Sequence, residues 1–233
     1  MSAPSDLYFA QLPVGEMANF AYLIGSRETR ECLVVDPAWS VDALVDQAER
    51  DGMNVVGALV THYHQDHVGG AIFGLQIEGV ARLLERAPVP IHVNAREAEG
   101  VRKVTGASAS DLVAHDGGDV VTLGRVRVRL LHTPGHTPGS QCFLVEEAGA
   151  PGRLVSGDTL FLGSCGRVDL PGGDPEAMYD SLVNQLGRLP EETLLFPGHF
   201  YAAEPSSTIG EQKRRNPYLR AARLEDFLSF MGY

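Results

Sequence analysis

The segment THYHQDHVGG, residues 61–70, constrains the fold of this chain most, because within six residues it gathers His62, His64, Asp66 and His67. The residues just before it, VVGALV at 55–60, are apolar and mostly β-branched, which predicts a buried strand. Several imidazoles and a carboxylate at the end of a buried strand are costly unless a partner binds them. This pattern therefore predicts a metal site where that strand ends.

Three more strand ends each carry one side chain that can bind a metal beside a glycine. His136 lies in LLHTPGHTPGS, Asp158 in LVSGDTLF and His199 in LLFPGHF. A neighbouring glycine lets the backbone turn sharply toward a bound ion. The chain thus offers five histidines and two aspartates, a set of nitrogen and oxygen donors that suits zinc, iron or manganese.

The spacing within the histidine cluster indicates how these ligands divide. Residues at i and i+2 of an extended segment point to the same side, so His62 and His64 can reach one ion. Asp66 and His67 lie further round the turn and can serve a second ion. Seven ligands exceed what one tetrahedral ion binds, and they divide well between two ions if one carboxylate bridges them.

Strand-like and helix-like segments alternate along the whole chain. Strands are predicted at 20–25, 31–37, 55–60, 89–93, in a hairpin around Gly124, and at 140–147, 153–158 and 193–199. Helices are predicted at 40–52, 77–88, 94–106 with Asn94 as N-cap, 174–190 with Asp174 as N-cap, and 217–231. This order indicates α/β sheets covered by helices, and we expect a single domain over residues 1–233.

Composition indicates which kinds of partner the protein does not bind and in which cellular compartment it is expected. A formal net charge of -11 argues against a nucleic-acid partner, because no basic field is present to hold phosphates. Three scattered cysteines do not form a disulfide framework, which favours a reducing compartment. No apolar run reaches the length of a membrane span, and the first residues do not follow the signal-peptide pattern. We expect a cytoplasmic protein with neither a nucleic-acid nor a membrane partner.

Four motifs in this order, THYHQDH, PGHTPGS, SGDTLF and FPGH, resemble the metallo-β-lactamase superfamily over residues from about 12 to about 219. The resemblance implies an αββα sandwich with metals at one edge of the two sheets. It implies that one metal is held by His62, His64 and His136, that a second is held by Asp66, His67 and His199, and that Asp158 bridges them. Asp36 in VVDPA resembles the aspartate that orients a ligand histidine in this family.

Within the superfamily, the motif SGDTLFLGSCGRVDLPGG is typical of glyoxalase II (hydroxyacylglutathione hydrolase) and of the related persulfide dioxygenases. True β-lactamases of the superfamily commonly carry cysteine at the position of Asp158, so antibiotic hydrolysis is not expected. Arg167 stands where glyoxalase II has a basic residue that contacts glutathione, and it is the predicted substrate contact. Asp169, however, replaces a glyoxalase II tyrosine, and GRVD resembles the GRTD of the dioxygenases. DHVGG and TPGHTPGSQCF resemble the hydrolases instead.

The resemblance predicts a metal-dependent hydrolase that cleaves a thioester, such as a hydroxyacyl-glutathione. Two divalent ions, with zinc preferred over iron or manganese, would share a hydroxide that attacks the carbonyl carbon. Asp66 is the predicted catalytic residue that orients this nucleophile. The alternative is a persulfide dioxygenase acting on glutathione persulfide, in which His62, His136 and Asp158 hold a single Fe(II). A third hypothesis is that the protein binds metal and a ligand without enzymatic activity.

Overall fold

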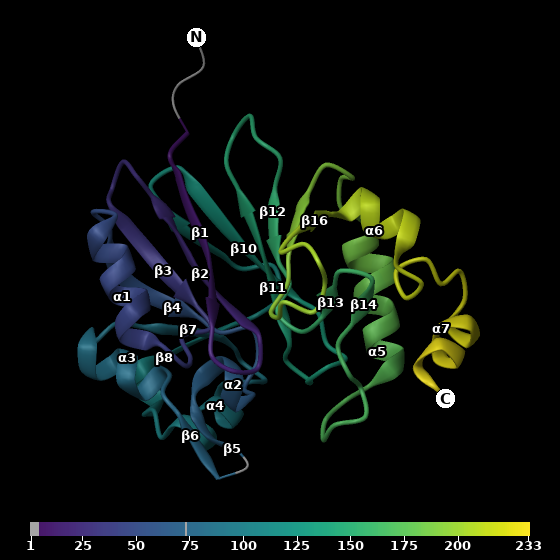
Figure 1. Ribbon diagram of the computed structural model, residues 1–233, viewed down its shortest axis with the longest axis horizontal. Helices are drawn as coiled ribbons and strands as arrows, with labels where there is room; N and C mark the ends of the chain where they lie inside the picture. Colours follow the sequence, from purple (N-terminus) through teal and green to yellow (C-terminus); the bar gives the residue numbers. More distant parts are fainter. Residues whose placement is uncertain (1–4, 73) are drawn as a thin grey trace.

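Two six-stranded sheets face each other, and helices cover the outer face of each sheet (Figure 1). The structure is a computed structural model that describes residues 5–72 and 74–233. The layers run helix, sheet, sheet, helix, which confirms the αββα sandwich expected from the sequence motifs.

The first sheet is built from the amino-terminal half of the chain. Its strand order is β1 (Leu7–Val14), β2 (Asn19–Ser26), β3 (Glu31–Val35), β4 (Asn54–Leu59), β7 (Ile91–Asn94) and β8 (Leu112–His115). Strands β3, β4, β7 and β8 are parallel to one another, so their carboxyl ends lie at the same edge. The outer face is covered by α1 (Val41–Arg50), α3 (Val80–Arg86) and α4 (Ala98–Thr105).

The second sheet comes from the carboxyl-terminal half. Its order is β16 (Ser207–Thr208), β15 (Leu194–Phe196), β12 (Arg153–Val155), β11 (Gln141–Glu146), β10 (Val126–His132) and β9 (Val120–Leu123). Its outer helices are α5 (Pro175–Tyr179), α6 (Ile209–Arg215) and α7 (Leu224–Met231). A π-helical segment, Asp180–Gln185, and a 3-10 turn, Leu186–Arg188, continue from α5, and a further 3-10 turn spans Ala109–Asp111.

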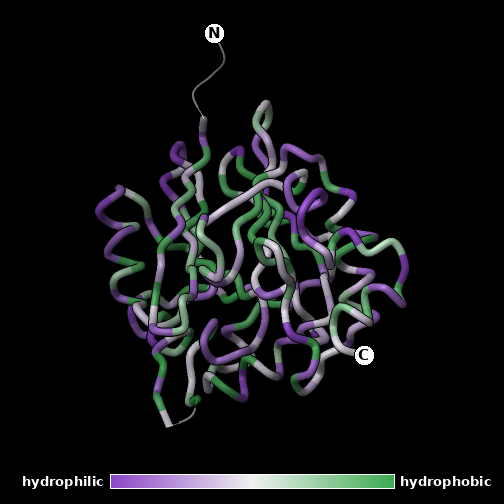
Figure 2. Tube along the Cα trace, turned by 45° about the vertical axis from the view of Figure 1, so that its right-hand side comes forward, coloured by the Kyte–Doolittle hydropathy of each residue, from purple (hydrophilic) through white to green (hydrophobic). Residues whose placement is uncertain are grey.

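One hydrophobic cluster lies between the two sheets, and further clusters lie between each sheet and its helices (Figure 2). On β10 the alternating residues Val126, Val128 and Leu130 are fully buried, as the period-two pattern predicts. Burying one such side chain stabilises the fold by about 1.5–3 kcal/mol. The two rigid sheets thereby fix the loops at their shared edge relative to each other.

Several elements differ from the secondary structure that the sequence predicts; α6 and β8, for example, were not predicted. The helix predicted at 94–106 begins only at Ala98, because Asn94 ends β7 and its Oδ1 accepts a hydrogen bond from the Arg96 amide at 3.0 Å. The helix predicted at 217–231 is limited to α7 (Leu224–Met231). Strand β1 was not predicted; it contains Pro13, which an edge strand tolerates because one side of it needs no ladder hydrogen bond.

Two observations bear on the inferences drawn from composition. Cys32, Cys142 and Cys165 are all buried and unpaired, in agreement with the absence of a disulfide framework. In the described ranges, no helix combines the length and the apolar character required to cross a bilayer.

Candidate metal centre

Seven side chains that the sequence analysis singled out converge at one edge of the sandwich. They come from the loops and the short helix that follow β4, β10, β12 and β15, and they are His62, His64, Asp66, His67, His136, Asp158 and His199. Ring nitrogens and carboxylate oxygens of these residues form three overlapping groups, each with its atoms within 4.8 Å of one another. Their role as metal ligands is the prediction that this geometry supports.

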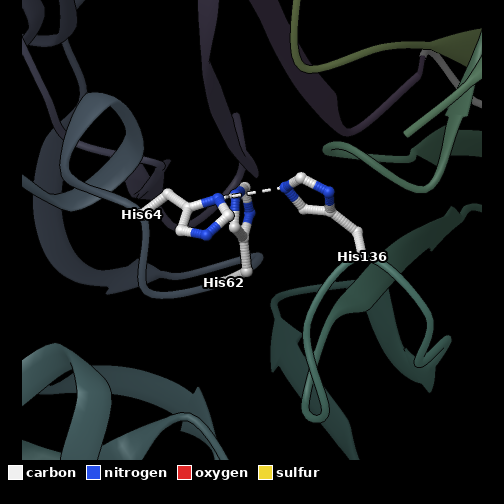
Figure 3. A group of neighbouring side chains, drawn as sticks. All are labelled: His62, His64 and His136. Carbon is white, nitrogen blue, oxygen red and sulfur yellow. Dashed lines mark hydrogen bonds between the residues drawn. The ribbon is translucent and has the colours of Figure 1, made fainter. Parts of the chain in front are cut away.

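The first group consists of His62, His64 and His136, and their rings point toward one another (Figure 3). The Nδ1 atom of His64 lies 3.0 Å from His62 Nε2 and 3.0 Å from His136 Nε2. Burial, together with the neighbouring imidazoles, lowers the pKa of His62 well below its usual value and that of His64 to about 4. Both rings are therefore uncharged at neutral pH, which is the form that binds a metal ion.

The second group consists of Asp66, His67 and His199. The helix α2 (Gln65–Val68) directly follows His64 and turns Asp66 and His67 away from the first group, as the spacing predicted. His67 Nε2 lies 3.2 Å from His199 Nε2, and Asp66 Oδ2 lies 3.3 Å from His199 Nε2. Burial lowers the pKa of His199, but Asp158 and Asp66 outweigh it and raise the pKa to about 9. When no cation is bound, His199 therefore carries a second ring proton at neutral pH.

Asp158 lies between the two groups, where a bridging carboxylate is expected. Its Oδ1 is 3.4 Å from His67 Nε2, and its Oδ2 is 3.4 Å from His199 Nε2 and 3.7 Å from His136 Nε2. The Oδ1 atom is buried and has no hydrogen-bond partner among the described residues. A buried carboxylate oxygen without a donor is costly, and a bound cation would remove that cost. The residues present therefore fit a pair of divalent ions.

Asp36 lies behind the second group and contacts His67. Its Oδ2 accepts a hydrogen bond from His67 Nδ1 at 2.9 Å, which leaves His67 Nε2 free to face the cluster. The Thr61 amide and hydroxyl donate to the two Asp36 oxygens at 2.8 and 2.7 Å. Asp36 has a φ of 52°, a left-handed conformation that aspartate adopts more readily than most residues. The predicted orienting role of Asp36 agrees with these contacts.

Two more histidines are held by backbone carbonyls. His136 Nδ1 donates to the Arg167 carbonyl at 2.8 Å, and His199 Nδ1 donates to the Met17 carbonyl at 2.9 Å. These bonds fix the tautomer of each ring, so that each Nε2 faces the cluster without a proton when a metal binds.

Sequence reasoning missed several side chains around the cluster. Asn19 Nδ2 donates to Asp66 Oδ2 at 3.0 Å, and Trp39 Nε1 donates to the Asp66 carbonyl at 3.0 Å. The Tyr201 ring stacks on His199 with centroids 4.6 Å apart. Asn19, a polar residue at the start of an otherwise apolar strand, carried a signal that was available. Nothing in the sequence around Trp39 or Tyr201 indicates a role near the cluster.

A cleft of about 510 Å³ opens directly above the cluster. Its wall includes Arg167, whose guanidinium forms two hydrogen bonds with Asp169, from Nε to Oδ1 at 2.9 Å and from Nη2 to Oδ2 at 2.8 Å. The exposed Arg167 side chain thus borders the cleft but is engaged with Asp169. Its contact with a substrate stays a prediction.

The fold agrees with a comparison of the chain against known families. Residues 14–199 match the family model described as the metallo-beta-lactamase superfamily. This chain belongs to that superfamily. It is 30% identical over 221 residues to the human mitochondrial protein named persulfide dioxygenase ETHE1, covering 92% of this chain and 76% of that protein. It is 29% identical over 227 residues to the probable metallo-hydrolase YqgX of Bacillus subtilis, covering 92% of this chain and 98% of that protein.

A solved structure with a similar fold is described as containing metal. TTHA1623, described in a di-iron-bound form, aligns with a TM-score of 0.69 and 32% sequence identity. The alignment covers 90% of this chain and 99% of that one. The relatives of this chain thus include proteins named as hydrolases and as dioxygenases.

Proposed function

We propose that this protein is a metal-dependent hydrolase that cleaves a thioester with the help of two divalent ions. One observation carries the proposal: two complete groups of three ligands lie side by side, and Asp158 contacts both. His62, His64 and His136 would hold the first ion. Asp66, His67 and His199 would hold the second, and Asp158 would join the two. Zinc suits this donor set best, and iron or manganese also fits it.

Two bound cations lower the pKa of water and polarise a carbonyl oxygen, which is the chemistry that thioester hydrolysis needs at neutral pH. The protein's own contribution is to hold the donors in place before a metal or a substrate arrives. Asp66 is held at Oδ2 by Asn19 and at its carbonyl by Trp39, so it is oriented toward the reacting centre. Hydrolysis expels a thiolate, which leaves without a proton donor because the thiol pKa is only about 8.5.

A second candidate function is persulfide oxidation, and the identity of 30% to the human protein of that name favours it. In that case His62, His136 and Asp158 would hold a single Fe(II), with open positions for dioxygen and a persulfide. The two functions differ in their co-substrate, since only the dioxygenase consumes oxygen.

The test is a pair of assays on the same metal-loaded protein. A panel of acyl thioesters is followed by thiol release, and glutathione persulfide is followed by oxygen uptake. We expect thiol release with at least one thioester and no oxygen uptake above that of His62→Ala. Oxygen uptake with persulfide, in the absence of thioester hydrolysis, would replace the first proposal with the second. Full activity in His62→Ala or Asp158→Ala would rule out both.

A further inference from the structure

The walls of the cleft above the metal cluster are mostly apolar, with Gln65 and Ser164 as uncharged polar exceptions. They are formed by Met17 from the β1–β2 turn, Ile72 from the β5–β6 hairpin (Gly70–Ile72 and Leu75–Ile77), Phe161 from the β13–β14 hairpin (Leu160–Phe161 and Ser164–Cys165), and Leu170 and Tyr201 from loops. These side chains come from distant parts of the chain, yet all border the same 510 Å³ space. A ligand that reaches the cluster must pass between them.

The cleft offers little charge for recognising a charged ligand. Outside the cluster itself, Arg167 is the one charged residue among the described residues that line it. Asp169 occupies one side of its guanidinium, from Nε at 2.9 Å and from Nη2 at 2.8 Å, so the ion pair carries no net charge, while Nη1 is not engaged by Asp169. A substrate carboxylate placed against these walls, away from the metal ions, would lose its water and meet only a guanidinium that is already paired with Asp169.

We propose that the substrate presents an uncharged, apolar acyl chain to these walls, and that its thiol carrier is not recognised through free carboxylates. This inference rests on the proposed thioester chemistry and names the substrate class. Each methylene that the cleft buries should raise kcat/KM by roughly fourfold, from the transfer free energy of a methylene group. The gain should stop when the chain is longer than the cleft.

The test compares acetyl, butyryl, hexanoyl and D-lactoyl thioesters, each made with glutathione and with uncharged N-acetylcysteamine. We expect the hexanoyl ester to exceed the acetyl ester by more than tenfold in kcat/KM, with less than threefold difference between the two carriers. Leu170→Ala should lower the hexanoyl value more than the acetyl value, and the control Val120→Ala, on an exposed residue of β9 outside this cleft, should leave both unchanged.

Other outcomes separate this inference from the proposed function. If D-lactoyl-glutathione is the best ester, or if exchanging glutathione for N-acetylcysteamine costs more than tenfold, the substrate class is wrong while the hydrolase stands. If the metal-loaded protein hydrolyses no ester of the panel, the proposed function fails and this inference fails with it.

A second, independent observation concerns Glu97, which the sequence analysis did not single out. Its side chain is fully buried, although an isolated glutamate is rarely found there. Its Oε2 accepts a hydrogen bond from the Tyr63 amide at 2.8 Å. Its Oε1 accepts from the Thr137 hydroxyl at 2.8 Å and from the Gly139 amide at 2.7 Å.

These partners lie in the two loops that carry the first ligand group. Tyr63 stands between His62 and His64 in the loop after β4, and Thr137 follows His136 in the loop after β10. The two loops belong to different sheets, and Figure 3 shows the histidine rings facing each other across the gap between them. We infer that Glu97 is a positioning residue that sets the separation between His136 and the other two histidines.

The packing around Glu97 supports a fixed separation. A Cβ added at Gly139 would lie 2.8 Å from both Cγ and Oε1 of Glu97, so the loop that carries His136 rests directly on this carboxylate. Glu97→Gln keeps the size of the side chain but leaves only one oxygen. Its amide NH₂ must then face a backbone N–H of one loop, which breaks the link between the two loops.

The test is a stepwise titration of the metal-free protein with Zn²⁺ against a chelating indicator. We expect Glu97→Gln to weaken one of the two binding steps by ten- to a hundredfold and to leave the other within threefold. The control Glu78→Gln makes the same change where a glutamate accepts from the Val41 amide at the start of α1, and both steps should be unaffected.

Equal weakening of both steps would indicate a general loss of structure, and unchanged binding would show that Glu97 positions nothing; either result overturns the inference. If Glu97→Gln does not fold, Gly139→Ala tests the same contact from the other side. It should produce the same loss in a single binding step, and an unchanged titration would again overturn the inference.

Discussion

Replacing Asp36 by asparagine tests how far the cluster depends on the residues behind it. Asparagine has nearly the same shape and also tolerates the left-handed backbone at φ 52°, so the fold should be preserved. The change removes the charge that accepts the 2.9 Å hydrogen bond from His67 Nδ1. Since the Thr61 amide requires the remaining oxygen, the new NH₂ group faces His67. His67 then accepts at Nδ1 and carries its proton on Nε2, and this proton must move before Nε2 can bind a metal.

The magnitude follows from the bond that is lost. Hydrogen bonds to charged groups contribute about 1.5–3 kcal/mol, which corresponds to a loss of roughly ten- to a hundredfold in the affinity for one ion. The assay is chelator competition with Zn²⁺ on metal-free Asp36→Asn. Asp111→Asn, which alters a capping aspartate in a 3-10 turn elsewhere, serves as the control. Affinity of Asp36→Asn within threefold of the unaltered protein would refute the account of how His67 is oriented.

Three further predictions follow from the same geometry. Asp158→Ala should lose both ions while His64→Ala retains one, as measured by metal content after desalting; equal retention would argue against a bridging carboxylate. In the metal-free protein the His199 pKa of about 9 lies above its usual 6.5, so its contribution to stability is complete below pH 6.5 and is lost as the pH rises through 9. Thermal unfolding at several pH values should show that decline, and a flat profile would contradict it. Leu130→Ala, between the sheets, should cost about 2–5 kcal/mol in urea unfolding, and a cost below 1 kcal/mol would contradict the described core.

The candidate ligands could be predicted because each follows a recognisable apolar strand and stands beside a glycine or another donor. His199 and Asp158 are far apart in sequence, yet the parallel pairing of β12 and β15 brings the ends of their strands together. Only glycine at position 198 permits this approach, because a Cβ there would lie 2.5 Å from Asp158 Oδ1. The sequence therefore contains both the donor residues and the glycine that lets them approach each other.

Glu97, Trp39 and Tyr201 could not be predicted as supporting residues, because nothing in their local sequence distinguishes them. Glu97 stands among charged residues, in the segment ARE, and reads as part of a solvated helix face. Only the tertiary packing of two loops against it reveals three hydrogen bonds. The start of α4 was misplaced for a similar reason, since the Asn94 side chain bonds the Arg96 amide in a turn that competes with the helix.

The most direct test of the central claim is elemental analysis of protein purified without added metal, expressed as ions per chain. Two ligand groups joined by Asp158 predict about two divalent ions per chain, with zinc, iron or a mixture of them. Close to one iron per chain and little else would contradict a two-metal hydrolase and favour the dioxygenase. Protein that contains no metal, and that takes none up on addition of Zn²⁺ or Fe²⁺, would contradict the metal centre itself.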